Sequence, residues 1–342
     1  MRKRFLVSSS PHYRARDSVR TVMLDVIIAL LPVLAVSVIY FGWRALTVTI
    51  VSVACCISFE TLFNFIRKKE NTATDLSCVV TGILLAFCLP VTVPYWLVAA
   101  GAAFAVIVVK MLFGGRGKNF ANPALAARAF LYAWPMLMTT FVSPLSGDRI
   151  SIFSAQILRG GDFTEVIDSI TTATPLKELK TGVMPAEGLF DIFMGNVGGC
   201  IGETCSAIIM LRGLYLLYRR VITWHIPVMY LGTVAFITLL FPLTGEIFDY
   251  EFMLAELFGG GLMLAAFFMA TDYSTSPTTA KGKLIFGVGC GLLTVFFRYF
   301  GSYSEGVSYA VLLMNIFAFS LDKVTRPRRF GIGGKKYYDE KR

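Results

Sequence analysis

Charged side chains are scarce in this chain of 342 residues. Asp, Glu, Lys and Arg make up 16% of the sequence, where a soluble domain carries about 25%. Hydrophobic residues make up 56%, so too little polar surface remains to cover a soluble globule of this size. The composition excludes a soluble enzyme and a disordered protein, and it argues against nucleic-acid binding despite a net charge of +10.

Metal-binding and nucleophilic patterns are equally sparse. The two histidines, His12 and His225, cannot form a His-rich metal site and offer almost nothing to a Ser-His-Asp triad. The seven cysteines include no CxxC pair, and all lie in or beside apolar runs. This pattern argues against an iron–sulfur, zinc or disulfide framework.

What the sequence has is long apolar runs. Ten of them approach the ~20 residues that a helix needs to cross a bilayer, so we expect an all-α polytopic membrane protein with about ten transmembrane helices. The third run is short and lies before Pro90 and Pro94, which predicts a broken or partial span. The expected spans are 22–40, 46–66, 76–89, 95–113, 123–141, 198–218, 226–242, 251–270, 284–299 and 306–321.

The distribution of basic residues predicts the topology. With the N-terminus inside the cell, most of the 32 Lys and Arg fall in alternate loops and tails on the cytoplasmic side. The first 20 residues show no signal-peptide pattern. The chain then divides into a tail with a first five-helix half (1–141), an extracytoplasmic loop (142–197), a second half (198–321) and a basic cytoplasmic tail (322–342). Two five-helix halves separated in this way have opposite orientations, as in inverted-repeat membrane folds.

Two polar stretches are expected at the inner surface. The first, residues 112–124, is rich in glycine and carries Asn119 and Asn122, whose amides suit a flat heterocycle or, alternatively, a tight turn with a helix cap. It is not a P-loop, because Asn119 stands where Ser or Thr should follow the Gly-Lys pair. The second, residues 270–279, carries Asp272 and several hydroxyls. Inverted repeats would bring both stretches to one polar cavity.

Five acidic residues are expected at or near membrane depth, where an uncompensated charge is costly. We treat them as candidates for an ion path, although a carboxylate that caps a helix is the alternative. They are Asp25, Glu60, Glu203, Glu256 and Asp272.

Several motifs together resemble a known family. They include Phe113-Gly-Gly-Arg-Gly-Lys-Asn-Phe-Ala-Asn-Pro-Ala124, Thr172-Ala-Thr-Pro-Leu176, Gly202-Glu-Thr204, Ala270-Thr-Asp272 and Ser304-Glu-Gly-Val-Ser308. In this order and combination the chain resembles the family that contains RnfD, a membrane component of the Rnf complex, the ion-translocating ferredoxin:NAD+ oxidoreductase of bacteria. NqrB, a component of the Na+-translocating NADH:quinone reductase, is similar to it.

The resemblance implies two flavins. Members carry FMN bound through a phosphodiester to the last threonine of a [S/T]-G-A-T motif, which here is Thr174, with Thr171 opening the motif and Asp168 preceding it. Thr172 stands where the family usually has glycine. Members also hold noncovalent riboflavin near the inner side, at positions that match Asn119 and Asn122.

The implied role is that of a membrane redox subunit of an Na+ or H+ pump, with no catalysis by the chain alone. Its implied partners are the other Rnf subunits (A, B, C, E and the FMN-carrying G), a flavin transferase and the lipid bilayer of the bacterial cell membrane. NqrB of the quinone reductase is the nearest alternative, but it usually has a longer N-terminal extension than the 21 residues before Val22. A flavin-free solute transporter or channel and a structural scaffold are the others. Either would leave Thr174→Ala without effect.

Overall fold

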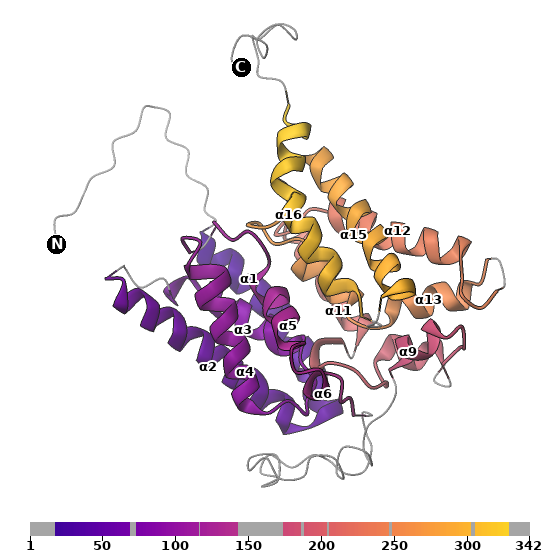
Figure 1. Cartoon of the computed structure of the whole chain (residues 1–342), viewed down its shortest axis with the longest axis horizontal. Coiled ribbons are helices and arrows are strands. Elements are labelled where there is room, and N and C mark those ends of the chain that lie inside the picture. Colours follow the sequence, from indigo (N-terminus) through magenta and orange to yellow (C-terminus); the bar gives the residue numbers. More distant parts are fainter. Residues whose placement is uncertain are drawn as a thin grey trace, which may run out of the picture.

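The computed structural model describes residues 18–68, 73–115, 117–142, 174–185, 188–203, 205–245, 248–301 and 305–327. These residues form helices and connecting turns, and no β-strand occurs among them. The expected all-helical class is therefore confirmed. Figure 1 shows two helical bundles side by side, one built from the first part of the chain (indigo to magenta) and one from the second (orange to yellow).

The first bundle begins with two long helices joined at Gly42, whose φ of 75° permits the sharp turn between them. Ser18 caps the first helix through a capping box with Thr21. Its elements are α1 (Val19–Phe41), α2 (Trp43–Ile66), the 3₁₀ turn η1 (Ala73–Asp75), α3 (Ser77–Phe87), α4 (Tyr95–Ala103), the π-helix η2 (Phe104–Met111), α5 (Pro123–Leu131) and α6 (Pro135–Met138).

The second bundle starts with short helices and ends with two long ones. Its elements are α9 (Pro175–Lys180), α10 (Leu189–Met194), the 3₁₀ turn η3 (Ile201–Glu203), α11 (Ser206–Tyr218), α12 (His225–Leu240), α13 (Tyr250–Phe258), α14 (Leu262–Leu264), the π-helix η4 (Ala265–Met269), α15 (Ala280–Phe300) and α16 (Val307–Thr325).

Among the described residues, four helices are long and apolar enough to cross a membrane, namely α1, α2, α15 and α16, and α13 with α14–η4 makes a fifth if that bent pair is one span. Large apolar side chains such as Ile39, Phe65 and Phe319 are more than two-thirds exposed, as lipid-facing side chains are. Each of the ten expected segments contains helix. However, α3 has only 11 residues, and the expected fifth span is divided because α5 ends at Leu131 and Pro135 begins α6.

Glycines shape the break in the bent pair. The two parts meet at 63° across Gly259, Gly260 and Gly261. Gly260 has a φ of +67°, and a Cβ there would lie 2.4 Å from Cδ1 of Leu176. The side chain of Leu176, in the first turn of α9, therefore fills the break. The geometry of the bent pair and the position of α9 thus depend on each other.

The two bundles are joined through the segment before α11. Ser37 Oγ donates to the carbonyl of Ile201 at 2.6 Å, and Ile201 N donates to the carbonyl of Leu89 at 3.0 Å. A Cβ on Gly202 would lie 2.3 Å from Cβ of Phe87. Helices α1 with α11 and α5 with α16 add contacts between the bundles. The close backbone approach at Gly202 explains why this turn contains glycine.

Candidate functional site

The glycine-rich turn between η2 and α5 presents two asparagines. Gly114, Gly115 and Gly117 all have positive φ, which brings the chain back toward the bundle within a few residues. Asn122 then caps α5, because its Oδ1 accepts from the backbone of Ala124 at 3.0 Å, and proline follows at the first helical position. A tight turn with a helix cap was one of the two interpretations of this stretch, and contact with a flat heterocycle was the other.

Asn122 also reaches the other bundle. Its Nδ2 donates to the carbonyl of Met269, the last residue of η4, at 3.2 Å. With its amide oriented to satisfy both groups, Asn315 of α16 accepts from Asn122 N at 3.1 Å and donates to the carbonyl of Thr275 at 3.2 Å. The start of α5, the end of η4 and α16 therefore meet at one place.

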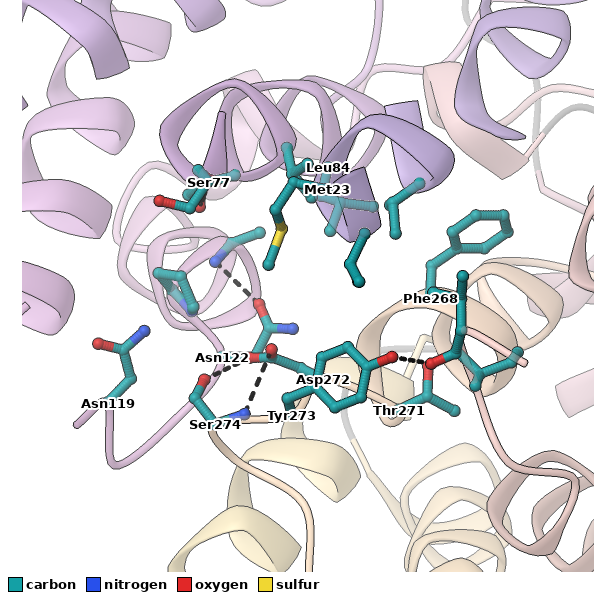
Figure 2. Close-up of a pocket in the computed structure, with 18 of the residues that line it drawn as sticks. Met23, Ser77, Leu84, Asn119, Asn122, Phe268, Thr271, Asp272, Tyr273 and Ser274 are labelled. Carbon is teal, nitrogen blue, oxygen red and sulfur yellow. Dashed lines mark hydrogen bonds between the residues drawn. The ribbon is translucent and has the colours of Figure 1, made fainter. Parts of the chain in front are cut away.

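A partly open cavity of about 450 Å³ lies at this meeting point. Figure 2 shows Asn119, Asn122 and Asp272 on one side of it, with Met23 and Leu84 across from them. Both bundles contribute to the walls, and apolar side chains predominate. The Asn119 and Asp272 stretches thus line one cavity, as expected, but its walls are mainly apolar where a polar cavity was expected.

One polar atom in this region has no partner. Asn119 Oδ1 is buried and accepts no hydrogen bond within the part of the chain that the structure describes. A buried amide oxygen without a donor is costly. Because Asn119 lines the cavity, a ligand with an N–H or O–H group at its edge would satisfy this oxygen.

The carboxylate of Asp272 accepts hydrogen bonds from residues of its own turn. Its Oδ2 accepts from Ser274 Oγ at 2.8 Å and from Thr275 Oγ1 at 3.4 Å. Burial raises the pKa of the Asp272 carboxyl, while these hydrogen bonds and the charge of Lys110 act in the opposite direction. The Asp272 carboxyl thus adds a titratable polar group to the cavity wall.

Lys110, near the end of η2, also lines the cavity. Its Nζ donates to Glu60 Oε2 at 2.6 Å and to Ser77 Oγ at 2.9 Å. Glu60 is fully buried, so its charge is compensated by the lysine. The sequence marked Glu60 as an acid at membrane depth, but it did not reveal this partner, which is 50 residues away.

The threonine expected to carry FMN lies in a second region. Thr174 precedes α9, and its side chain makes no capping hydrogen bond with that helix. The side chain is buried and lines a small cavity of about 10 Å³ together with Leu176, Glu203 and Glu305. Asp168 and Thr171 fall outside the described residues.

Beneath Thr174 lies a buried charge cluster. Arg128 of α5 donates to Glu203 Oε1 at 3.2 Å and forms a short contact with Glu305. Cys200 Sγ accepts from the same guanidinium nitrogen at 3.4 Å, and its backbone N–H donates to Glu203 Oε2 at 3.3 Å. We call these four residues the Arg128 cluster. Among the predicted site residues it contains only Glu203, because no pattern in the sequence indicates its partners.

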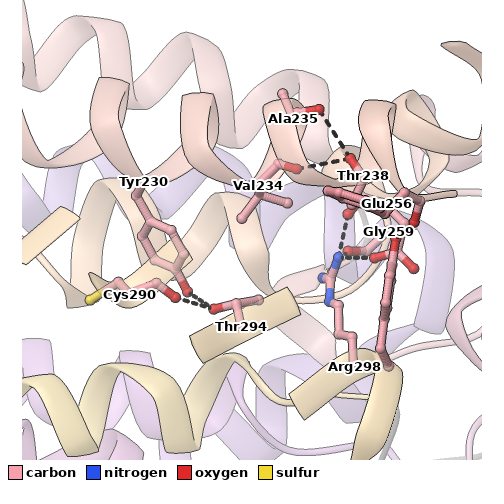
Figure 3. A network of polar contacts seen from close by, with 11 residues as sticks. Tyr230, Val234, Ala235, Thr238, Glu256, Gly259, Cys290, Thr294 and Arg298 are labelled. Carbon is pink, nitrogen blue, oxygen red and sulfur yellow. Dashed lines mark hydrogen bonds and ion pairs between the residues drawn. The ribbon is translucent and has the colours of Figure 1, made fainter. Parts of the chain in front are cut away.

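The remaining predicted acids have partners too. Asp25 of α1 pairs with Arg219 at 3.1 Å, which links α1 to the end of α11. Glu256 of α13 pairs with Arg298 of α15 at 2.6 Å. Arg298 also donates to the carbonyl of Gly259 at 3.0 Å, as Figure 3 shows, so it caps the end of α13 at the break. Among the described residues, the five acids thus have different partners in different parts of the two bundles.

The two regions lie at different heights along α1. Val19, Val22 and Val26 line the larger cavity, whereas Ser37 bonds Ile201, two residues before Glu203. At 1.5 Å per helical residue, Ser37 lies about 16 Å beyond Val26 along the helix axis. The larger cavity and the Arg128 cluster thus lie near different ends of α1.

Comparison with known proteins shows the family of the chain. The model of the NQR2, RnfD, RnfE family matches residues 6–331. The chain belongs to this family. One relative in the family is the D subunit of the Na+-translocating ferredoxin:NAD+ oxidoreductase complex of Acetobacterium woodii, which is 43% identical over 332 residues, covering 95% of each chain.

Two further family members have similar coverage. The D subunit of the proton-translocating ferredoxin:NAD+ oxidoreductase complex of Clostridium ljungdahlii is 40% identical over 337 residues, 96% of each chain. The D subunit of the ion-translocating oxidoreductase complex of Escherichia coli is 36% identical over 350 residues, 96% of this chain and 98% of the relative. Since relatives named for Na+ and for protons differ little in identity to this chain, overall similarity does not select the ion.

Proposed function

We propose that the chain is the D-type membrane subunit of an ion-translocating ferredoxin:NAD+ oxidoreductase and passes electrons between two flavins across the bilayer. The names of the family members and their near-complete coverage support the complex. The two polar regions at different heights of α1 support the transfer. In this proposal, ten helical segments form two inverted halves, with both termini on the cytoplasmic side of a bacterial cell membrane.

The larger cavity fits noncovalent riboflavin. Its volume of about 450 Å³ lies within the range of roughly 300–1,000 Å³ that small-molecule sites occupy. The apolar wall around Met23 and Leu84 would exclude water from a flat ring, while Asn119 Oδ1 would accept from an N–H at the ring edge. The unpartnered Asn119 oxygen is the observation that carries this assignment.

Thr174 supplies the hydroxyl required for covalent FMN. Its Oγ1 would attack the FMN phosphorus of a flavin dinucleotide bound to flavin transferase. The Oγ1 proton would be lost, the phosphoanhydride bond would break, and AMP would leave. The cavity of about 10 Å³ beside Thr174 has no room for a flavin ring, so the ring would lie outside it. The Arg128 cluster beneath Thr174 would hold α5, the η3 turn and the start of α16 in fixed positions. The bound flavins supply one-electron and two-electron chemistry, and the other Rnf subunits supply and remove the electrons.

The test is flavin analysis of the full chain expressed beside a flavin transferase. After denaturation, the wild type should fluoresce in a gel and gain the mass of FMN minus one water, whereas Thr174→Ala should do neither. Thr181→Ala, an exposed threonine at the end of α9, is the matched control and should retain the label. Riboflavin released from the wild type should be detected separately by chromatography. A chain that contains no flavin in this experiment would favour the transporter alternative.

A further inference from the structure

Arg212 differs from the other cationic side chains inside the apolar helices. Ion pairs or backbone carbonyls compensate Lys110, Arg128, Arg298 and Arg44. Arg212 of α11, in contrast, forms no ion pair and no hydrogen bond with the residues that the structure describes. A charged side chain at membrane depth is costly unless it is paired. Arg212 therefore requires a partner that this part of the chain does not supply.

The position of Arg212 on α11 argues for a partner inside the bilayer. Arg212 is the middle residue of this helix, which spans Ser206–Tyr218. At 1.5 Å per residue, it lies about 9 Å from either end. Arginines near a helix end can extend to the lipid headgroups, and Arg219, at the cytoplasmic end of α11 in the proposed topology, stands at such a place. Arg212 lies about two turns deeper, where the acyl chains of lipids offer no anion.

The exposed end of the Arg212 side chain suits a carboxylate. Its Nε is buried without a partner, whereas the residue as a whole is partly exposed. Its terminal nitrogens thus reach the surface of the chain, and they too have no acceptor among the described residues. The two terminal nitrogens of a guanidinium match the two oxygens of a carboxylate in a bidentate pair. An Asp or Glu that approaches from outside the chain would make this pair.

Helices α1 and α11 form the surface around Arg212. Asp25 of α1 pairs with Arg219 at one end of their contact. Ser37 bonds Ile201 at the other end, so the two helices run antiparallel. Arg212 lies about two turns before Arg219, and so on the same side of α11. Because the Arg219 side chain is 50% exposed, this side is at the outer edge of the contact between the two helices.

Apolar side chains beside Arg212 are exposed as well. Leu211 and Leu214 of α11 and Leu31 of α1 are each more than half exposed. Leu31 lies nearly two turns beyond Asp25 on α1, and is therefore close to the level of Arg212. We call Arg212 and these three leucines the α1–α11 surface. It presents one cation on an apolar background, so a membrane helix with one acidic residue among apolar ones is complementary to it.

A second copy of this chain does not fit the α1–α11 surface. In a two-fold contact both copies present the same residues, so Arg212 would face a surface of arginine and leucine. Helix α11 contains no acid, and the acid of α1, Asp25, already pairs with Arg219. The complementary helix therefore belongs to a different chain.

We propose that the α1–α11 surface binds a transmembrane helix of another membrane subunit of the complex, and that an Asp or Glu of that helix pairs with Arg212. This inference rests on the proposed place of the chain in a multi-subunit oxidoreductase. The apolar part of the helix covers Leu211, Leu214 and Leu31. Its carboxylate compensates the cation, so that neither charge is left unpaired in the bilayer. The pair also fixes the register between the two subunits.

The first test identifies the neighbour of this surface. The full complex is produced in cells with an affinity tag on this chain and with p-benzoylphenylalanine, a photoreactive residue, in place of Leu211. After irradiation, the tagged chain is purified and the peptide joined to it is identified by mass spectrometry. We expect a peptide from another membrane subunit, with an Asp or Glu within about one helical turn of the crosslink. The same probe in place of Leu292, exposed on α15, is the control and should not yield that peptide.

Charge variants then test the ion pair. Arg212→Leu in the full chain produced alone should melt in detergent at or above the wild-type temperature, because an unpaired charge is removed. In the complex, recovery of the crosslinked subunit with the tagged chain should fall about tenfold or more, because a buried carboxylate loses its cation. Replacing that carboxylate residue by Leu as well should restore recovery to within about twofold. Lys281→Leu, at an exposed lysine in the first turn of α15, is the control and should leave recovery unchanged.

The outcomes separate this inference from the proposed function. A tagged wild-type chain that recovers no other subunit of the oxidoreductase would overturn the proposed function, and this inference with it. A chain that recovers the subunits but whose probe at position 211 joins only lipid would overturn the inference alone. Recovery that is unchanged in Arg212→Leu, or that falls equally in Lys281→Leu, would also overturn it, because no specific pair would then exist. So would an Arg212→Leu chain that melts well below wild type when produced alone, because the arginine would then stabilise its own chain.

Discussion

Asn122 Nδ2 donates to the main-chain oxygen of Met269, across 147 positions of sequence, and so joins the first turn of α5 to the end of η4. The same side chain caps α5 through its oxygen. One asparagine thereby sets the helix start and the distance between the two walls of the larger cavity. Both roles use the side-chain amide. Replacing its nitrogen by oxygen keeps the cap of α5 and removes the hydrogen bond to Met269.

Asn122→Asp is expected to retain the α5 cap but lose the donor to Met269, whereas Asn122→Ala loses both. Loss of the cap costs about 1 kcal/mol. We therefore expect the alanine variant to melt at a lower temperature than the aspartate variant, and both to bind riboflavin at least tenfold more weakly than wild type. Thermal melting and fluorescence quenching in detergent measure the two effects. Equal riboflavin affinity in wild type and both variants would show that the bridge does not shape the cavity.

Arg128→Met is expected to be among the most damaging single changes in the chain. It would leave Glu203 and Glu305 buried without a cation, and breaking a buried ion pair in this way costs about 3–5 kcal/mol. Expression level and thermal midpoint of the detergent-solubilised protein report the loss. Adding Glu203→Gln and Glu305→Gln to Arg128→Met should recover part of it, because no unpaired charge then remains. If the triple variant is no better than the single one, the loss comes from packing and not from charge.

The sequence predicted the helical class and the common cavity because both depend on local or repeated patterns. Apolar runs indicate membrane helices directly, and the predicted topology placed the Asn119 stretch, between the fourth and fifth spans, and the Asp272 stretch, after the eighth span, at the same inner surface. Span lengths were less predictable. Hydropathy alone does not show that Pro135 starts a new helix or that η3 precedes α11, because an apolar turn and an apolar helix have the same composition.

The partners of the buried charged residues could not be predicted from the sequence, for a different reason. A charged residue inside an apolar run signals that compensation is needed, but it does not identify the partner. Arg128 lies 75 positions from Glu203 and 177 from Glu305, and only the packing of α5 against α16 and the η3 turn brings them together. The roles of Thr174, Asn119 and the five acids stay predictions until flavin and ion measurements are made.

Gly260→Ala is expected to disturb the region around Thr174. A side chain there is strained at a φ of +67°, and its Cβ would lie 2.4 Å from Leu176 Cδ1. We expect destabilisation by more than about 1 kcal/mol and at least a twofold drop in covalent flavin at Thr174, measured by intact mass. Gly232→Ala is the matched control: it lies within α12, where an added Cβ meets no atom within 4 Å, and should leave labelling unchanged. If both variants carry the same amount of covalent flavin, the geometry of the break does not affect flavin attachment.

Asp272→Asn is expected to change how stability depends on pH. Burial raises the pKa of Asp272 above its ordinary value of 3.8, so the folded protein holds this proton more tightly than the unfolded chain does. Its contribution to stability is therefore greatest at low pH and is lost as the pH rises from about 4 through the raised pKa. Asparagine stays neutral throughout and can still accept the Ser274 hydrogen bond. The difference in thermal midpoint between Asp272→Asn and wild type should thus shift in favour of the variant as the pH rises, measured without riboflavin so that ligand binding does not contribute. A difference that stays constant with pH, or that shifts toward the wild type, would mean that hydrogen bonds and the charge of Lys110 outweigh burial at this carboxyl.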